Sequence, residues 1–207
     1  MDETGSRRYA SLRREAQARE TRADIARAAR ALFVAHGWSA TTVRAVADEA
    51  KVSVPTIYAT YGDKAGLVRA VADAADLSAD PMTMLAELEA GTAREQLAAM
   101  AAYDRRLFER AGDVIALVRE AARTEPELAA AYREGRRRGD ETRLRVFDSW
   151  PAGALRPGVD VRSAADIYAA LCNIDVYTTL TSEREWHPDA VEQWWGEALA
   201  RELLRTP

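Results

Sequence analysis

The sequence has 207 residues, of which 48% are hydrophobic and 30% charged, with a formal net charge of -4, as in an ordinary soluble globular protein. This composition excludes a membrane-spanning protein, because no apolar run approaches the roughly twenty residues needed to cross a bilayer. The N-terminus is charged and lacks the apolar core of a signal peptide, so we expect a cytoplasmic protein.

Charge is unevenly distributed along the chain. Residues 1–70 hold twelve basic and eight acidic side chains and carry +4, so the remaining residues carry -8. A basic N-terminal third attached to an acidic body suits a phosphate-binding end, and the acidic remainder discourages indiscriminate binding.

Residues 1–20 form a polar, arginine-rich arm. Two interpretations of this arm stay open. It is either a solvated tail, as a frayed helix or a disordered segment, or an arm that adds phosphate or minor-groove contacts. The second interpretation would use four arginines: Arg7, Arg8, Arg13 and Arg14.

Residues 21–37 predict the most regular helix in the chain, because apolar side chains recur there at helical spacing. Thr21 and Asp24 form the Thr-x-x-Asp pattern of a capping box, and Gly37 is a glycine of the kind that ends helices.

Residues 41–50 and 53–61 predict two short helices joined by a tight turn, which is a helix-turn-helix. Thr41 and Ser53 are candidate N-caps, and Pro55 lies in the first turn, where proline is tolerated. The second helix turns short, uncharged side chains outward, so it can enter a DNA major groove closely enough to touch base edges.

These segments resemble the DNA-binding domain of the TetR (tetracycline repressor) family of transcriptional regulators. The residues that match in register are Ile25, Ala28, Ala29, Leu32, Phe33, Gly37, Trp38, Thr41, Thr42, Val43, Ala47, Ala50, Val52, Ser53, Thr56, Ile57, Tyr58, Tyr61, Lys64 and Leu67. So many matches are a specific signal, whereas the remainder of the chain is similar to the family only in length and helical organisation.

The resemblance implies an all-α fold with an N-terminal three-helix helix-turn-helix headpiece and a larger C-terminal helical domain. The expected divisions are the arm at residues 1–20, the DNA-binding domain at 21–70, and a ligand-binding and dimerisation domain at 71–207.

The resemblance also implies DNA contacts. The matching positions are Thr42, Arg44, Ser53, Val54, Pro55, Thr56, Tyr58, Thr60 and Lys64. For Tyr58 the alternative is a ring that seals the headpiece core. Lys64 has little evident packing reason, which favours a phosphate contact for its ammonium group.

Lys51 departs from the family pattern, because the family usually has glycine at this place in the turn. A left-handed backbone there would cost lysine roughly 1 kcal/mol relative to glycine. We expect the fold to tolerate this cost.

Turn signals separate the expected helices of the C-terminal body. These cover residues 83–90, 93–110 and 114–123, a helix that starts at 124–126 and extends towards 150, residues 161–181, and a last helix from 187. The arginine-rich run at 133–145 is interleaved with acids, so a solvated helix face is favoured over a second nucleic-acid patch.

The penultimate helix is apolar on nearly all sides, which suggests that a partner subunit covers part of it. In the family, two terminal helices from each subunit usually form a four-helix homodimer interface. The candidate interface residues are Tyr168, Leu171, Val176, Leu180, Trp194, Trp195 and Leu199. Because adjacent helical positions point about 100° apart, one tryptophan should pack inside the subunit and the other towards the partner.

A site for an unknown small-molecule effector is implied by the resemblance. The candidate lining residues are Tyr103, Phe108, Tyr132, Trp150, Tyr168 and Asn173. For each of them a place in the core is the alternative. Asn173 and Asp175 are polar residues in an apolar helix, and they either take a functional role, hydrogen-bond across the dimer seam or face solvent.

No residues support catalysis, a cofactor or a metal. The two histidines lie at expected helix ends, and the sequence has no metal-ligand spacing, glycine-rich phosphate loop or nucleophile elbow. Cys172 is the single cysteine and is interpreted as a buried thiol, with redox sensing as a weak alternative.

The sequence therefore predicts a homodimeric transcriptional regulator, a repressor released from a palindromic operator in double-stranded DNA by a small molecule. The alternative is a helical dimeric ligand-binding or interaction protein that does not bind an operator. The sequence leaves open the effector, the operator and whether regulation is negative or positive.

Overall fold

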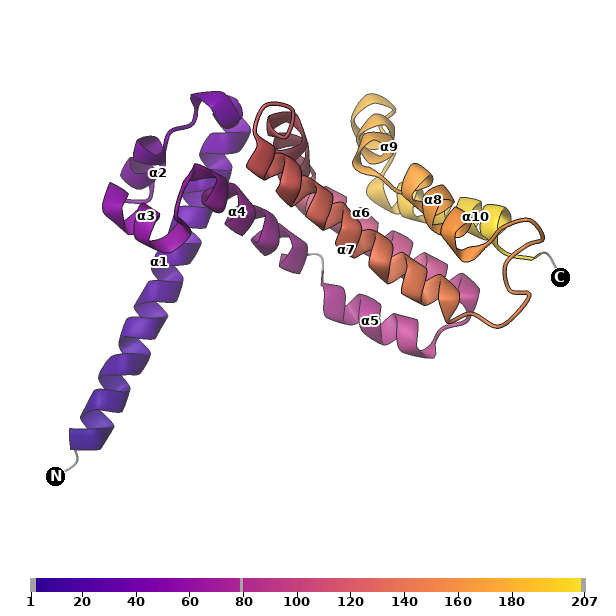
Figure 1. The fold of residues 1–207 in the computed structure, drawn as a ribbon, viewed down its shortest axis with the longest axis horizontal. Helices are drawn as coiled ribbons and strands as arrows, with labels where there is room; N and C mark the ends of the chain where they lie inside the picture. The colour runs from indigo at the N-terminus through magenta and orange to yellow at the C-terminus, as the bar shows by residue number, and fades with distance from the viewer. Residues whose placement is uncertain (1–2, 79, 206–207) are drawn as a thin grey trace. The chain divides into compact units, whose positions relative to one another are not determined.

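The computed structural model describes residues 3–78 and 80–205, which are helical and contain no strand (Figure 1). The expected all-α fold class is thereby confirmed. The chain divides into two compact units, one ending at Val71 and the other beginning at Ala72. Within the described residues, no helix is both long enough and apolar enough to span a membrane.

The N-terminal unit contains the helix-turn-helix. Its helices are α1 (Glu3–Ala40), α2 (Val43–Glu49), α3 (Val54–Tyr61) and the beginning of α4 (Lys64–Ser78). Five large apolar side chains from all four helices are at most 1% exposed and form its core: Ile25, Phe33, Val46, Ile57 and Leu67. Because burying each such side chain stabilises the fold by about 1.5–3 kcal/mol, these contacts hold the short helices α2 and α3 in place.

Helix α1 begins much earlier than the sequence pattern indicated. The expected capping box at Thr21 is wrong, because the Thr21 hydroxyl donates a hydrogen bond to the Gln17 carbonyl one turn back, at 2.9 Å. Residues 10–20 are rich in alanine, arginine and glutamate, whose high helix propensity extends the helix through the arm. Gly37, with φ 75°, is the point where helical geometry is interrupted.

The arm therefore has a helical backbone from Glu3 onwards. Arg13 is exposed, whereas the side chains of Arg7, Arg8 and Arg14 lie outside the described residues. Contact of the arm with DNA stays a prediction.

The sequence suggested Thr41 as the N-cap of α2, but Thr41 does not cap this helix. Its side chain is buried, and its hydroxyl is within hydrogen-bond distance of the carbonyl oxygens of Leu32 (3.0 Å) and Gly37 (2.9 Å). Thr42 is the cap, because its hydroxyl oxygen accepts a hydrogen bond from the Ala45 amide at 3.0 Å. Thr41 instead donates its hydroxyl proton to carbonyl oxygens of the last turns of α1.

The C-terminal unit is a bundle of longer helices. It contains α5 (Pro81–Ala90), α6 (Ala93–Ala121), α7 (Pro126–Asp148), α8 (Val161–Leu171), α9 (Ile174–Thr178), the π-helical turn η1 (Thr179–Glu183) and α10 (Pro188–Leu203). Helix α6 is central to this unit, because α5, α7, α9 and α10 all pack against it.

Helix α6 is a single helix where two were expected. Gly112 does not end it, although glycine in a helix costs about 1 kcal/mol relative to alanine. A Cβ atom at this position would lie 3.1 Å from the Ile174 side chain. Gly112 therefore allows α9 to approach α6 closely.

The expected helix over residues 161–181 is broken. Helix α8 ends at Leu171, and α9 begins after Asn173, whose side-chain oxygen accepts hydrogen bonds from the amides of Asp175 (3.0 Å) and Val176 (3.1 Å). Asp175 forms an ion pair with Arg119 of α6. Both polar residues thus have local structural roles, as a helix cap and as a tie between α9 and α6.

Trp195 anchors α10 in the core of this unit. Its side chain is fully buried, and its ring centroid lies 6.0 Å from that of Phe108 and 6.2 Å from that of Tyr177. At the edge of the same contact, the Arg105 guanidinium of α6 donates a hydrogen bond to the Glu192 carboxylate of α10 at 2.9 Å. These contacts join α10 firmly to α6.

Candidate DNA interface and effector cavity

Helix α3 has one fully buried side chain, which holds it against the core, and several exposed ones. Ile57 faces the core and is fully buried, whereas Ser53, Pro55 and Tyr58 are exposed. The Tyr58 side chain is 51% exposed, so the alternative in which its ring seals the headpiece core is wrong. The sequence-predicted contact positions on α3 thus share its outward surface with the half-buried side chains of Val54, Thr56 and Thr60.

The hydroxyl groups of α3 are largely engaged by the helix itself. Ser53 caps the helix by accepting from the Thr56 amide at 3.2 Å, and the two hydroxyl oxygens lie 2.8 Å apart. The Thr60 hydroxyl donates to the Thr56 carbonyl at 2.7 Å. This helix therefore offers methyl groups and hydroxyl lone pairs to base edges, together with the exposed Tyr58 hydroxyl.

Lys64 is more constrained than the sequence argument allowed. Its ammonium nitrogen lies 4.1 Å from the centroid of the Trp38 ring and donates a hydrogen bond to the Trp38 carbonyl oxygen. Trp38 in turn stacks on Phe33 of the core. The view that Lys64 lacks a packing reason is wrong, because it fixes Trp38 through a cation–π contact and a hydrogen bond.

The junction between α3 and α4 depends on a glycine that the sequence analysis did not single out. A Cβ atom at Gly66 would lie 1.9 Å from the Tyr61 carbonyl oxygen, so only glycine fits there. The Asp63 carboxylate caps the new helix by accepting from the Gly66 amide at 2.6 Å. This close turn sets where α4 starts relative to α3.

The turn between α2 and α3 has the left-handed backbone expected from the family pattern. Lys51 has φ 55°, its amide donates to the Asp48 carbonyl at 3.3 Å, and the Val52 amide donates to the Ala47 carbonyl at 3.0 Å. This pair of bonds is a Schellman motif, which glycine usually terminates. Lys51 therefore bears the steric cost of a positive φ while keeping an exposed positive charge beside α3.

Replacing Lys51 separates that strain from its charge. We expect Lys51→Gly to raise the free energy of unfolding by up to about 1 kcal/mol, because relief of the strain is partly offset by the greater freedom of glycine in the unfolded chain. Lys51→Ala is the matched control, since it removes the charge and keeps the strain. Thermal melts measure the difference, and a Lys51→Gly protein less stable than Lys51→Ala would contradict the strain.

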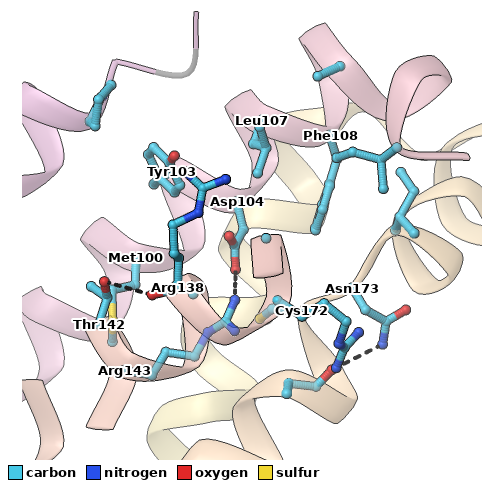
Figure 2. Close-up of a pocket in the computed structure, with 18 of the residues that line it drawn as sticks. Met100, Tyr103, Asp104, Leu107, Phe108, Arg138, Thr142, Arg143, Cys172 and Asn173 are labelled. Carbon is cyan, nitrogen blue, oxygen red and sulfur yellow. Dashed lines mark hydrogen bonds and ion pairs between the residues drawn. The ribbon is translucent and has the colours of Figure 1, made fainter. Parts of the chain in front are cut away.

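The C-terminal unit contains a cavity of about 670 Å³, whose walls come mainly from α6 and α7 (Figure 2). A cavity of this volume is large enough for a drug-sized molecule. Five of the six sequence-predicted lining residues do line it: Tyr103, Phe108, Tyr132, Tyr168 and Asn173.

Trp150 is the sixth candidate, and its assignment to the cavity is wrong. Its ring packs on Phe147 with the centroids 4.8 Å apart, and its indole nitrogen donates to the side-chain oxygen of Gln96. Trp150 therefore belongs to the core at the end of α7, which was the alternative for this residue.

A buried ion pair, which sequence reasoning missed, forms part of the cavity wall. Asp104 of α6 is 5% exposed, and its carboxylate accepts hydrogen bonds from the Arg143 guanidinium of α7 (3.2 Å) and the Tyr168 hydroxyl of α8 (3.0 Å). The Arg143 guanidinium also lies 4.7 Å from the Tyr168 ring centroid. One carboxylate therefore holds three helices together, and Figure 2 shows its pairing with Arg143 inside the cavity.

The surroundings of this carboxylate fix the protonation states of its neighbours. Burial, and then the Asp104 charge, raise the pKa of the Tyr168 hydroxyl well above its ordinary value, so it stays a donor. Burial alone would lower the pKa of Arg143, but the charge of Asp104 above all raises it, and the guanidinium stays charged. Burial also raises the pKa of the Cys172 thiol, which makes it a poor redox sensor.

The arginine-rich run on α7 is mainly the solvated face that the sequence indicated. Arg137 pairs with Glu134 and Glu141 on the exposed side of the helix. Arg143 differs, because it turns into the unit to reach Asp104. Only contacts from another helix distinguish it from its neighbours, so spacing along α7 could not single it out.

Removing the carboxylate leaves the Arg143 charge buried without its main partner. We expect Asp104→Ala to lower the free energy of unfolding by about 3–5 kcal/mol, as for other broken buried pairs. The matched control is Asp140→Ala, which removes the other carboxylate on Arg143, is 43% exposed in its side chain, and should cost less than about 1 kcal/mol. Denaturant unfolding measures both, and equal losses would show that burial of Asp104 is unimportant.

The headpiece geometry and the helical body define a helix-turn-helix protein with a cavity in a separate unit. Residues 25–71 match the model of the bacterial regulatory proteins of the tetR family. This match covers the helix-turn-helix, where the resemblance of the residues to this family was predicted from the sequence. No curated protein matches the sequence.

Solved structures share the fold over most of the chain. NalD of Pseudomonas aeruginosa, the secondary repressor of the MexAB-OprM multidrug efflux pump, has a TM-score of 0.72–0.75 in two structures and is 21% identical over 92% of this chain and 99–100% of its own. FadR of Bacillus subtilis, in complex with stearoyl-CoA, has a TM-score of 0.71 and is 18% identical over 86% of this chain and 97% of its own. A Saccharomonospora viridis protein described as a transcriptional regulator, in complex with choline, has a TM-score of 0.72 and is 21% identical over 90% of this chain and 99% of its own.

Proposed function

We propose that this protein is a transcriptional repressor that binds a palindromic operator as a homodimer and is released when a small molecule occupies the cavity among α6, α7 and α8. The observation that carries the proposal is the combination, in one chain, of an outward-facing, uncharged helix in a helix-turn-helix and a cavity of about 670 Å³ in the other unit.

Two of the structural neighbours support the ligand part of this proposal. One was solved with choline and another with stearoyl-CoA, and a third is described as a repressor. They share the fold with this chain, so a ligand-responsive regulator is the function that explains both units. The second candidate, a dimeric ligand-binding protein without operator binding, explains the cavity but gives no reason for the exposed surface of α3.

The DNA contacts proposed here come from three places in the headpiece. Arg44 is exposed on α2 and makes no ion pair within the described residues, so its charge is available to a phosphate. Helix α3 supplies the base-edge contacts from the positions predicted from the sequence. Lys64 keeps a proposed phosphate contact, in addition to its contact with Trp38.

Operator binding is tested by selecting bound fragments from the genome of the source organism and footprinting them. We expect a palindrome whose half-sites are separated by about one helical turn, roughly 10 bp, or a small multiple of it. Arg44→Gln should weaken binding on every sequence and reduce the slope of log K against log salt by about 0.9 for the phosphate it loses. It is a cleaner probe than Lys64→Ala, which would also release Trp38.

A purified dimer that selects no fragments would support the second candidate and overturn operator binding. A bound site without two-fold symmetry would contradict the homodimer on DNA, while leaving recognition by α3 intact.

The proposed dimer interface is narrower than the sequence indicated. Tyr168, Trp195 and Leu199 are fully buried within the single chain, so they cannot contact a partner directly. The candidates that keep exposed surface are Leu171, Val176, Leu180 and Trp194. The Trp194 ring also lies 6.2 Å from Trp186, which is 39% exposed, so an apolar face extends from α10 to the segment before it.

The two adjacent tryptophans give a matched test of this interface. Trp194→Ala should shift the protein to monomers at micromolar concentration with a small loss of monomer stability, because tryptophans at interface centres contribute about 2 kcal/mol or more to binding. Trp195→Ala should instead lower the free energy of unfolding by about 3–5 kcal/mol through a core cavity. Light scattering and thermal melts distinguish them, and a dimeric Trp194→Ala protein would contradict this interface.

A further inference from the structure

We propose that the effector is an anionic amphiphile, an apolar chain or ring system that ends in a carboxylate, and that Arg138 binds its charged end. The inference rests on the proposed function, because it assumes that the cavity is the effector site. It goes further by assigning the class of ligand and the residue that selects it.

The cavity walls are suited to an apolar body. Helix α6 contributes Met100, Leu107 and Phe108, and α5 contributes Met84. Burying a ligand's hydrocarbon against such side chains is favourable by about 0.8 kcal/mol per CH₂ group. A small, fully polar molecule would leave these walls without a partner, so most of the ligand must be apolar.

More positive than negative side chains line the cavity. The cavity is lined by four arginines, Arg136, Arg138, Arg143 and Arg145, and by three carboxylates, Asp73, Asp104 and Asp175. Two of the carboxylates are already paired, Asp104 with Arg143 and Asp175 with Arg119. One carboxylate therefore remains against three arginines, which favours an anion.

We assign that anion to Arg138, an exposed arginine that lines the cavity. Figure 2 shows its side chain extending from α7 to the Tyr103 ring, on the side of the cavity away from Cys172 and Asn173. Within the described residues its guanidinium makes no hydrogen bond or ion pair, although Glu134, one turn away, attracts it. The Arg136 guanidinium is likewise unpaired there, whereas Arg145 donates to Thr142. A guanidinium presents paired donors that match the two oxygens of a carboxylate.

A cationic ligand finds the partners around Asp104 occupied. The buried carboxylate that would attract it, Asp104, already accepts from Arg143 and Tyr168. The Tyr168 ring, the aromatic face next to that carboxylate, is already covered by the Arg143 guanidinium. The same contacts that build the wall thus disfavour a positive charge.

The test uses three probes that share an unbranched chain of ten carbons and differ in their head group: decanoate, decan-1-ol and decyltrimethylammonium. Isothermal titration calorimetry at pH 7.5 and low salt gives each affinity, with the protein free of DNA. We expect decanoate to bind about tenfold or more tightly than decan-1-ol, because a charge-assisted hydrogen bond exceeds a neutral one. Decyltrimethylammonium should bind more weakly than decanoate.

Three variants locate the head group. Arg138→Gln should bring the affinity for decanoate close to that for decan-1-ol, whereas Arg138→Lys should keep part of the preference. Arg133→Gln is the matched control, because Arg133 is exposed on the same helix, as Arg138 is, but does not line the cavity, and it should behave like the unmodified protein. Thermal melts check that all three are folded.

The inference is overturned if decanoate does not bind, if decyltrimethylammonium binds as tightly, or if Arg138→Gln keeps the full preference for decanoate. Its failure is distinct from that of the proposed function. Arg138-dependent binding of decanoate without release of operator DNA would uphold the ligand class and contradict the effector role, whereas release by an uncharged ligand would do the reverse.

Discussion

The C-terminal unit depends on one buried carboxylate. Asp104 is held by Arg143 and Tyr168, so a single charge connects α6, α7 and α8. A buried ion pair adds little net stability over apolar packing, because desolvating both charges opposes their attraction. The pair instead fixes how α6, α7 and α8 are placed, because the carboxylate accepts both hydrogen bonds only when both donors lie next to it. The cavity lies beside this junction, and Asp104, Arg143 and Tyr168 are all among its lining residues.

The headpiece follows a different strategy, because helices of seven and eight residues, α2 and α3, are too short to be stable alone. Each is fixed at its ends by local chemistry, with Thr42 and Ser53 as N-caps. The Schellman turn at Lys51 and the close approach at Gly66 then set the spacing before and after α3. Strain at Lys51 is tolerated because these bonds and the core on either side determine the backbone there.

Local signals explain what the sequence could predict. The cap at Ser53 was readable, because it depends on residues within one turn, and together with the family resemblance it located the helix-turn-helix. The same signals misled where tertiary contacts compete. Gly112 resembles a helix end until Ile174 packs against it, and an apolar run hid the break that Asn173 caps.

The candidate site was less predictable, for a related reason. Aromatic residues such as Tyr103 and Phe108 attract attention in a sequence, and both line the cavity. Asp104 and Arg143 look like ordinary surface charges, because their partners are 39 and 64 positions away. Lys64 was misjudged in the opposite sense, since its partner Trp38 lies 26 positions earlier. The role of a charged side chain depends on its partner, and the partner is known only once the chain is folded.

Helix α6 gives the cavity a physical route to the proposed dimer face. Tyr103 and Leu107 line the cavity, and Arg105, between them in sequence, pairs with Glu192 on α10. A ligand changes a conformational equilibrium only by the difference in its affinity for the two states. Helix α6 also contacts α10, through the hydrogen bond of Arg105 and through Trp195. A ligand that displaces α6 therefore acts on a helix that packs against α10. Because cores are close-packed, those contacts are the route by which a displacement of α6 would reach α10.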